Sequence, residues 1–123
     1  MKKFAYSTVF LALFFLSGCG TVQTNTVSEI PITIPPGRFY FHSKTCAHCA
    51  IVDQYISDNK ISQKLYFVSQ QLETDPEAVA FLKDVGKKCT ISDADLGVPL
   101  FWDGTKCYLG DQSVIDYFKQ TVK

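Results

Sequence analysis

The chain has 123 residues and a mass of 13.8 kDa, with 46% hydrophobic, 14% aromatic and 20% charged residues. Its 7 glycines and 5 prolines are too few for a collagen-like or low-complexity chain, so we expect one folded domain with a single core. The 12 Lys and Arg residues balance the 12 Asp and Glu residues, and no basic cluster appears beyond Lys2-Lys3 and Lys87-Lys88. The sequence therefore does not predict binding to nucleic acid.

The first 19 residues have the organisation of an export leader. Lys2 and Lys3 precede an apolar run from Phe4 to about Leu16, and Ser17-Gly18-Cys19 follows. The run has about 13 residues, whereas a helix needs about 20 to cross a bilayer. We therefore interpret it as a targeting segment.

The stretch that ends at Cys19 resembles the leader and lipobox of bacterial lipoprotein precursors. The resemblance implies cleavage before Cys19, acylation of Cys19, and a mature protein anchored on the outer side of a membrane in the cell envelope. Several acyl chains give the stable anchoring that one chain does not. Gly20, by the same resemblance, favours the periplasmic face of the outer membrane in a host with two membranes. An uncleaved anchor, or a signal peptide with a coincidental Cys, is the alternative.

A tether is predicted after the lipidated Cys. The segment 20–37 is rich in Thr, Ser, Asn, Gln and Val and lacks Lys and Arg. This segment ends with Ile34-Pro35-Pro36-Gly37. A flexible coil of this length spans about 23 Å, enough to hold a domain clear of lipid headgroups. The predicted organisation is a signal peptide over 1–18, the lipidated Cys and tether over 19–37, and one domain over 38–123.

The domain begins with alternating strand and helix signals. Arg38–His42 is a short aromatic strand, and apolar residues every three or four positions from Cys46 predict a helix that ends near Asp58-Asn59. Leu65–Val68 is predicted as the second strand. A second helix opens at Asp75-Pro76, with Asp as N-cap and Pro at the first helical position, and Gly86 is predicted to close it.

A hairpin and a third helix complete the domain. Val98–Trp102 is predicted as a strand, Asp103-Gly104 as a turn, and Lys106–Leu109 as the returning strand. The last helix is predicted to be capped by Asp111 and to bury Val114, Ile115, Phe118 and Val122. The order β-α-β-α-β-β-α predicts an α/β domain in which a mixed four-stranded sheet joins two parallel strands to a hairpin and is covered by helices.

The motif Cys46-Ala47-His48-Cys49 lies where the first strand meets the first helix. A Cys in the first turn of a helix faces unpaired N–H groups and the positive end of the helix dipole, which favour a thiolate, so Cys46 is the predicted nucleophile. Cys49, one turn deeper and within disulfide reach, is the predicted resolving residue. A protonated His48 beside the pair would stabilise the Cys46 thiolate and make the disulfide a stronger oxidant.

A zinc site is the competing interpretation of a Cys-x-x-Cys motif. Zinc usually takes four ligands, but Cys89 and Cys107 do not form a second such motif, and His42 and His48 are the only imidazoles. We therefore predict a redox-active pair, with no metal and no cofactor beyond the Cys46/Cys49 disulfide. Two alternatives stay open: a module in which these cysteines and a His hold a soft ion such as Cu(I), and a structural lipoprotein without redox function.

The domain resembles the thioredoxin superfamily in its short, glutaredoxin-like form, over roughly Arg38 to Lys123. The similarity rests on Phe39-Tyr40-Phe41 before the Cys motif, on Val98-Pro99, and on Asp103-Gly104 followed by Leu109-Gly110-Asp111. It implies a three-layer fold with helices on both faces of the sheet, a cis Pro99 that packs against the Cys pair, and a Val98 backbone that pairs with substrate. His48 at the third position of the motif and Val98 before the proline are similar to the residues found there in extracytoplasmic disulfide oxidants. This similarity favours oxidation or isomerisation of protein disulfides.

Three residues depart from that family's pattern. Tyr40 stands where many members carry a buried acid, six residues before the nucleophile, so the proton route is not predicted. Ala47 replaces the usual Pro of the motif. Leu109 takes the first position of the Gly-Gly pair with which glutaredoxins approach glutathione. The predicted partners are therefore protein thiols and disulfides and an unknown redox partner, not glutathione.

Cys89 and Cys107 are the remaining cysteines. With Cys19 acylated and Cys46 paired with Cys49, they form an even pair in an oxidising compartment. A structural disulfide that holds the 87–97 loop against the hairpin is the main expectation. The spacing of these two cysteines also allows a second redox pair that passes electrons to the first, and this alternative stays open.

Overall fold

The computed structural model describes residues 31–123; Cys19 and the predicted leader lie outside the described residues. One sheet is formed by four strands: β1 (Phe39–His42), β2 (Val68–Gln71), β3 (Leu100–Trp102) and β4 (Cys107–Leu109). Their order across the sheet is β2-β1-β3-β4. β1 and β2 run parallel, whereas β3 is antiparallel to both β1 and β4. Two parallel strands are thus joined to a hairpin, as the sequence predicts.

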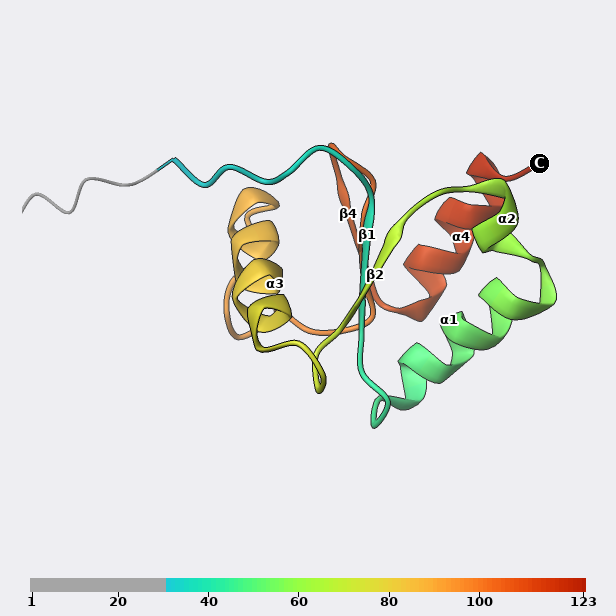
Figure 1. The fold of residues 1–123 in the computed structure, drawn as a ribbon, viewed down its shortest axis with the longest axis horizontal. Helices are drawn as coiled ribbons and strands as arrows, with labels where there is room; N and C mark the ends of the chain where they lie inside the picture. Colours follow the sequence, from blue (N-terminus) through green and yellow to red (C-terminus); the bar gives the residue numbers. More distant parts are fainter. Residues whose placement is uncertain (1–30) are drawn as a thin grey trace, which may run out of the picture. The chain divides into compact units, whose positions relative to one another are not determined.

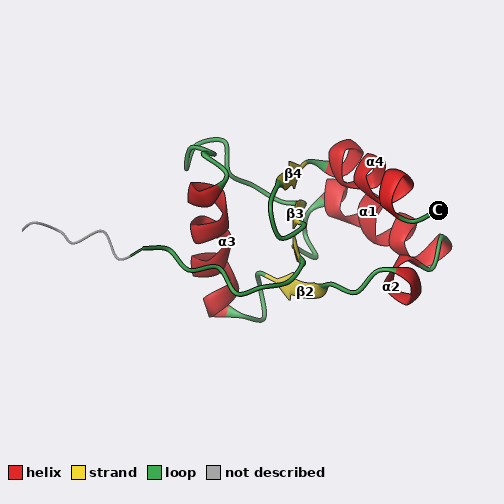
Figure 2. Ribbon diagram, turned by 90° about the horizontal axis from the view of Figure 1, so that it is seen from above, coloured by secondary structure: helices red, strands yellow, loops and turns green. Residues whose placement is uncertain are grey.

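The helices lie on both sides of this sheet (Figures 1 and 2). They are α1 (Ala47–Asp58), α2 (Ile61–Lys64), α3 (Pro76–Lys88) and α4 (Asp111–Thr121). α3 lies on one side, and α1, α2 and α4 lie on the other. The predicted α/β class, with a mixed four-stranded sheet between helix layers, is confirmed. None of the helices in residues 31–123 combines the length and the apolarity needed to cross a membrane.

The alternation of side chains along β1 divides the core into two clusters. Tyr40 packs with Val52 of α1 and Phe118 of α4, whereas Phe39 and Phe41 point to the opposite face and pack against α3. Successive side chains of a strand point to opposite faces, so three consecutive aromatic residues supply both layers. Each large side chain buried in this way contributes about 1.5–3 kcal/mol relative to an exposed one.

The second strand lies three residues further along the chain than predicted. The predicted strand Leu65–Val68 is wrong because the helix α2 continues to Lys64 and Leu65 caps it. The strand instead begins at Val68, where the backbone N–H donates to the carbonyl of Arg38 at 2.9 Å. Leu65 and Phe67 still pack against the core from the connecting segment. Backbone pairing with β1, and not the apolar run, sets this polar edge strand.

Gly86 does not close the third helix, contrary to prediction. α3 continues to Lys88 and is capped by Cys89. A Cβ atom at Gly86 would lie only 2.7 Å from Cδ1 of Leu96. Gly86 is therefore the place where the loop after α3 packs closely on the helix, and not the end of the helix. The predicted start is confirmed, since the Asp75 carboxylate accepts from the N–H of Glu77 at 2.9 Å and Pro76 is the first helical residue.

The sequence suggested that Asp111 caps the last helix, and this prediction is wrong. Gly110 is the N-cap, with a φ of 89° that favours glycine, and Asp111 is the first helical residue. The helix buries Val114, Ile115 and Phe118 as predicted, and Val122 packs against the same cluster in a half-buried position. The shift by one residue leaves the carboxylate of Asp111 available to a side chain outside its own helix.

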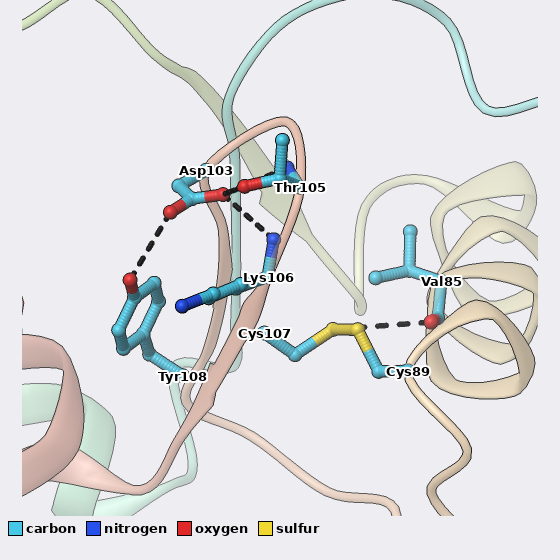
Figure 3. Close-up of a disulfide and its surroundings, with 7 residues drawn as sticks. All are labelled: Val85, Cys89, Asp103, Thr105, Lys106, Cys107 and Tyr108. Carbon is cyan, nitrogen blue, oxygen red and sulfur yellow. Dashed lines mark hydrogen bonds between the residues drawn. A yellow bond between two sulfur atoms is a disulfide. The ribbon is translucent and has the colours of Figure 1, made fainter.

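The hairpin strands are shorter than predicted, because β3 begins at Leu100 and β4 at Cys107. Pro99 has no N–H to donate to a ladder. At the turn, one oxygen of Asp103 accepts from the backbone N–H groups of Thr105 and Lys106, both at 2.7 Å. Its other oxygen accepts from the hydroxyl of Tyr108 at 3.1 Å (Figure 3). These bonds hold the two strands in register at the turn that the Asp-Gly pair predicts.

Candidate redox site

Cys46 and Cys49 lie together at the start of α1. Cys46 is the N-cap of the helix, and its sulfur accepts a hydrogen bond from the backbone N–H of Cys49 at 3.1 Å. Both cysteines are free thiols; Cys46 is partly exposed, whereas the side chain of Cys49 is completely buried. The sulfur that a substrate can reach is therefore that of Cys46.

The inner thiol, that of Cys49, does not ionise readily. Burial, reinforced by the hydrogen bond with Cys46 and the charge of Asp53, raises the pKa of Cys49 to about 12. A buried sulfur remains protonated at neutral pH unless a nearby base removes its proton. This matches the predicted division of roles, in which Cys46 attacks and Cys49 acts later.

Val98 and Pro99 lie beside the cysteine pair although they are about fifty residues away in sequence. The thiol of Cys46 donates to the carbonyl oxygen of Val98 at 3.5 Å, and the Val98–Pro99 peptide bond is cis, the isomer that the resemblance implies. A cavity of about 280 Å³ is lined by both residues together with His48, Gly110 and Asp111. Together with Cys49, whose backbone N–H bonds to Cys46, the structure thus brings the five predicted redox-site residues to one place: Cys46, His48, Cys49, Val98 and Pro99.

His48 has a partner that the sequence analysis missed. Its side chain is 71% exposed, and Nδ1 lies 3.2 Å from Oδ2 of Asp111 at the start of α4. The hydrogen bond with His48, helped by the backbone N–H of Gln112, lowers the pKa of Asp111. No hydrogen bond joins His48 to Cys46 in the described part of the chain. Any effect of His48 on the cysteine pair therefore acts through space.

A second group of polar residues lies behind the buried thiol. The hydroxyl of Tyr40 donates to Oδ1 of Asp53 at 2.9 Å and lies 3.5 Å from the carbonyl oxygen of Cys49. Nδ1 of His42 is 3.6 Å from the other oxygen of Asp53, and its ring stacks on Tyr40 with centroids 4.9 Å apart. The sequence did contain a signal for Asp53, because a residue four positions after Cys49 lies on the same helix face.

Cys89 and Cys107 form a disulfide on the side of the sheet that α3 covers (Figure 3). The bond joins the C-cap of α3 to the first residue of β4, with Cα atoms 6.1 Å apart. Both cysteines pack against the cluster that contains Phe39 and Phe41, whereas Tyr40 lies in the other cluster. The disulfide thus fastens the last turn of α3 to the edge of the sheet.

Among residues 31–123, no three Cys, His, Asp or Glu side chains converge as ligands for a metal ion. The other imidazole, His42, has Nε2 at 2.8 Å from the hydroxyl oxygen of Ser69, and its Nδ1 lies 3.6 Å from Oδ2 of Asp53 without a hydrogen bond.

No family model and no curated protein matches this chain. Among solved structures, it is similar to the holo form of glutaredoxin C1 from Populus tremula x tremuloides, with 14% identity, a TM-score of 0.47, and coverage of 70% of this chain and 77% of that one. A buckwheat glutaredoxin–glutathione complex gives 15% identity and a TM-score of 0.48, covering 68% of this chain and 69% of that one. Oxidized glutaredoxin 2 from Chlamydomonas reinhardtii gives 13% and 0.48, covering 70% and 74%.

The class is defined by the molecule itself: a mixed sheet of order β2-β1-β3-β4 between helix layers, a dithiol at the start of α1, and a cis proline beside it. This is the thioredoxin-like fold in its short form, as the resemblance implies.

Proposed function

We propose that the protein is a thiol–disulfide oxidoreductase that acts on protein thiols and disulfides through Cys46 and Cys49. One observation carries this proposal: a partly exposed sulfur at a helix N-terminus lies beside a buried thiol of raised pKa, with the Val98–Pro99 backbone within 3.5 Å of the exposed sulfur. A structural pair of cysteines has no need of this asymmetry between an accessible and a protected sulfur.

The proposed reduction of a substrate disulfide has two steps. The thiolate of Cys46 attacks one substrate sulfur, which forms a mixed disulfide and releases the other substrate sulfur as a thiolate that takes up a proton. Cys49 then loses its proton and attacks the sulfur of Cys46, which forms the Cys46–Cys49 disulfide and releases the second substrate thiol. Two electrons pass to the substrate, and the same steps in reverse oxidise a substrate dithiol.

Substrate would lie along the Val98–Pro99 segment. The cavity beside this segment is lined in part by Gly97 and Gly110, which have no side chain to fill it. An extended peptide placed there would present its sulfur to Cys46. The pair formed by His48 and Asp111 lies at the same cavity, and we propose that protonated His48 there favours the reduced form of the dithiol.

The proposed location is the extracytoplasmic side of a bacterial membrane, with Cys19 as the lipidated residue. This rests on the sequence of the leader alone, and the predicted direction, oxidation or isomerisation, rests on the resemblance. The reduction potential of the Cys46/Cys49 pair decides the direction. A value near −270 mV, as for thioredoxin, would indicate a reductase, and one near −120 mV an oxidant.

Turnover of a protein disulfide tests the proposal. We expect the wild-type protein to reduce insulin, or to reactivate scrambled ribonuclease, and Cys46→Ser to lose this activity because no thiolate remains to attack. A Cys89→Ser/Cys107→Ser variant is the matched control for loss of cysteines and is expected to keep the activity. Equal activities of the wild-type protein and Cys46→Ser would overturn the proposal.

A further inference from the structure

The loop between β2 and α3 lies beside the turn that leads into Cys46. β1 and β2 run parallel, so the chain leaves both strands at the same end of the sheet (Figure 1). The ladder continues by one hydrogen bond beyond β2, because the backbone N–H of Leu72 donates to the carbonyl of His42 at 3.1 Å. The next residues along the two chains are Glu73 and Ser43. Two residues that are 30 positions apart in sequence thus meet next to the dithiol.

Glu73 holds this turn through Ser43. Its carboxylate oxygen Oε1 accepts a hydrogen bond from the hydroxyl of Ser43. The same hydroxyl oxygen accepts the backbone N–H of Thr45 at 3.2 Å. The carbonyl of Ser43 accepts the backbone N–H of Cys46 at 3.3 Å. The side chain and the backbone of Ser43 together therefore connect the carboxylate to the residue that carries the exposed sulfur.

The carboxylate of Glu73 is a strong acceptor in this arrangement. The side chain is exposed, and the hydrogen bond from Ser43, helped by the backbone N–H groups of Lys44 and Thr45, lowers the pKa of Glu73. It is therefore ionised at neutral pH, and a charged acceptor forms stronger hydrogen bonds than a neutral one. Residues 43–46 lie between the end of β1 and the start of α1, so no regular element holds them in place.

The loop that carries Glu73 is itself held by its own backbone. The N–H groups of Thr74 and Asp75 donate to the carbonyl of Gln71 at 3.4 Å and 3.3 Å. Asp75 is then the N-cap of α3. The carboxylate is thus presented to Ser43 from a fixed position between a strand and a helix.

The turn decides where the sulfur of Cys46 lies. As the N-cap of α1, this sulfur accepts the backbone N–H of Cys49 at 3.1 Å, an interaction that stabilises a thiolate. The position requires the extended backbone that Cys46 has, with φ −92° and ψ 113°. Burial raises the pKa of Cys49, and a hydrogen bond from the backbone of Ser43 opposes this rise. A displaced turn would weaken the interactions of both cysteines.

The charge of Glu73 by itself would have the opposite effect, because a negative charge raises the pKa of a nearby thiol. The other ionisable groups around the dithiol come from the turn, from β1, from α1 and from α4: Lys44, Tyr40, His48, Asp53 and Asp111. None of their side chains bonds to Glu73 in the part of the chain that the structure describes. A positioning effect and a charge effect of Glu73 therefore differ in sign and can be separated.

We propose that Glu73 is a positioning residue that holds Cys46 in its reactive geometry by acting through Ser43. Without the carboxylate, the turn is free to move, so Cys46 spends less time as the cap of α1 and its thiolate is less stable. The inference rests on the proposed function, since it takes Cys46 as the attacking sulfur. It adds the β2–α3 loop to a site whose other members come from α1, α4 and the segment before β3.

The rate at which iodoacetamide alkylates Cys46 tests this inference. The reagent is neutral, so the charge of Glu73 does not steer it, and peptide mass spectrometry of the reduced full-length protein identifies the modified cysteine. We expect Glu73→Ala to lower the rate at neutral pH by about 5-fold, the factor that corresponds to one typical hydrogen bond. The pH at which the rate is half-maximal should rise. Glu73→Gln should lie nearer to the wild-type protein, because its amide oxygen still accepts the hydroxyl of Ser43.

Glu77→Ala is the matched control, because Glu77 is an exposed carboxylate in the first turn of α3 and has no bond to the 43–46 turn among the described residues. Alkylation of Glu73→Ala as fast as that of Glu77→Ala, or faster, would refute the inference. Ser43→Ala tests the route. If Glu73 acts through Ser43, the Ser43→Ala/Glu73→Ala variant should be no slower than the slower single variant. Two effects that multiply would also refute it.

A merely structural role of Glu73 has a different signature. A general loss of stability lowers the melting temperature but leaves the pH profile of the folded protein unchanged. Thermal unfolding is therefore measured for each variant. A shifted pH profile in folded Glu73→Ala supports the positioning role, whereas a lowered melting temperature with an unshifted profile contradicts it.

Insulin reduction by the wild-type protein keeps this inference apart from the proposed function. If the wild-type protein reduces insulin and Glu73→Ala is alkylated like Glu77→Ala, only the inference fails. If the wild-type protein does not reduce insulin but Glu73→Ala shows the expected shift, the proposed function fails and the positioning of Cys46 by Glu73 stands.

Discussion

The carboxylate of Asp103 accepts four hydrogen bonds from three residues that follow it: two from Thr105, one from Lys106 and one from Tyr108. Partial burial alone would raise its pKa, but the N–H groups of Lys106 and Thr105 favour the charged form more strongly, so the pKa of Asp103 lies below its usual value. A carboxylate with a lowered pKa in the folded state stabilises the fold at every pH above the unfolded value of about 3.9, and this contribution is lost as the pH falls through the folded value.

We expect Asp103→Ala to lower the free energy of unfolding by about 1–2 kcal/mol at neutral pH, since charged acceptors form the stronger hydrogen bonds and this one is only partly buried. The difference from the wild-type protein should shrink when the pH falls below about 4, because protonation then removes the same bonds from the native residue. Urea unfolding at neutral and acidic pH measures both. Asp93→Ala, at an exposed position, serves as the control, and a pH-independent effect of Asp103→Ala would contradict the explanation.

At the level of single residues, the reactive residues are easier to predict from the sequence than the side chains that contact them. Cys46, Cys49 and the Val98-Pro99 pair follow from local motifs, and the structure brings them together. The contact of Asp53 with Tyr40 and that of Asp111 with His48 do not follow, because each pair joins two different elements. Which carboxylate meets which side chain depends on the packing of α1 on β1 and of α4 against α1, and no local pattern contains that information.

The disulfide between Cys89 and Cys107 links the end of α3 to β4. It closes a loop with a sequence separation of 18 residues between the C-cap of α3 and β4. The unfolded chain gains freedom when such a loop is opened, and the chain-entropy model gives about 3 kcal/mol for a loop of this size.

A Cys89→Ala/Cys107→Ala variant is therefore expected to be less stable by about 3 kcal/mol while keeping the reactivity of Cys46 with Ellman's reagent. Denaturant unfolding and the release of nitrothiobenzoate measure the two properties. The alternative interpretation, a second redox pair, predicts the opposite result: little change in stability, but impaired electron transfer between Cys46–Cys49 and a protein substrate.

Element types follow from the sequence more reliably than element limits. The helix that contains Val52 is recognised by its apolar spacing, and the helix that contains Leu82 by the Asp75-Pro76 signal at its start. The second strand is misplaced because an edge strand with a polar sequence, Val-Ser-Gln-Gln, carries no apolar pattern and is defined by its hydrogen bonds to β1. The end of α3 is misplaced because Gly86 serves close packing against Leu96, which a sequence does not distinguish from a helix stop.

At the level of the whole molecule, the proposal that the domain is tethered to a membrane is tested through Cys19. In a bacterial host, the full-length protein is expected in the membrane fraction and to incorporate a labelled fatty acid. Cys19→Ala should abolish the labelling, because no other residue of the leader offers the acylated thiol. The Cys89→Ala/Cys107→Ala variant controls for loss of cysteines. Labelling that persists in Cys19→Ala would contradict lipidation at this residue, and membrane retention without labelling would indicate an uncleaved anchor.

The fold class of residues 38–123 follows from the order of elements, because two parallel strands joined to a hairpin leave few ways to cover a sheet. The division of the core follows less directly. It depends on which face each residue of β1 takes, and this is fixed by the pairing of Phe39 with Val68 and Trp102 on the neighbouring strands.

That division gives substitutions in the two layers separate consequences. Tyr40 and the helix that carries the dithiol share one cluster, whereas Phe41, α3 and the Cys89–Cys107 bond share the other. Substitutions around α3 are therefore expected to change mainly thermal stability, whereas those around α1 are expected to change sulfur chemistry as well. The same separation would allow the α3 layer to be redesigned for higher stability while the layer that carries the dithiol is left unchanged.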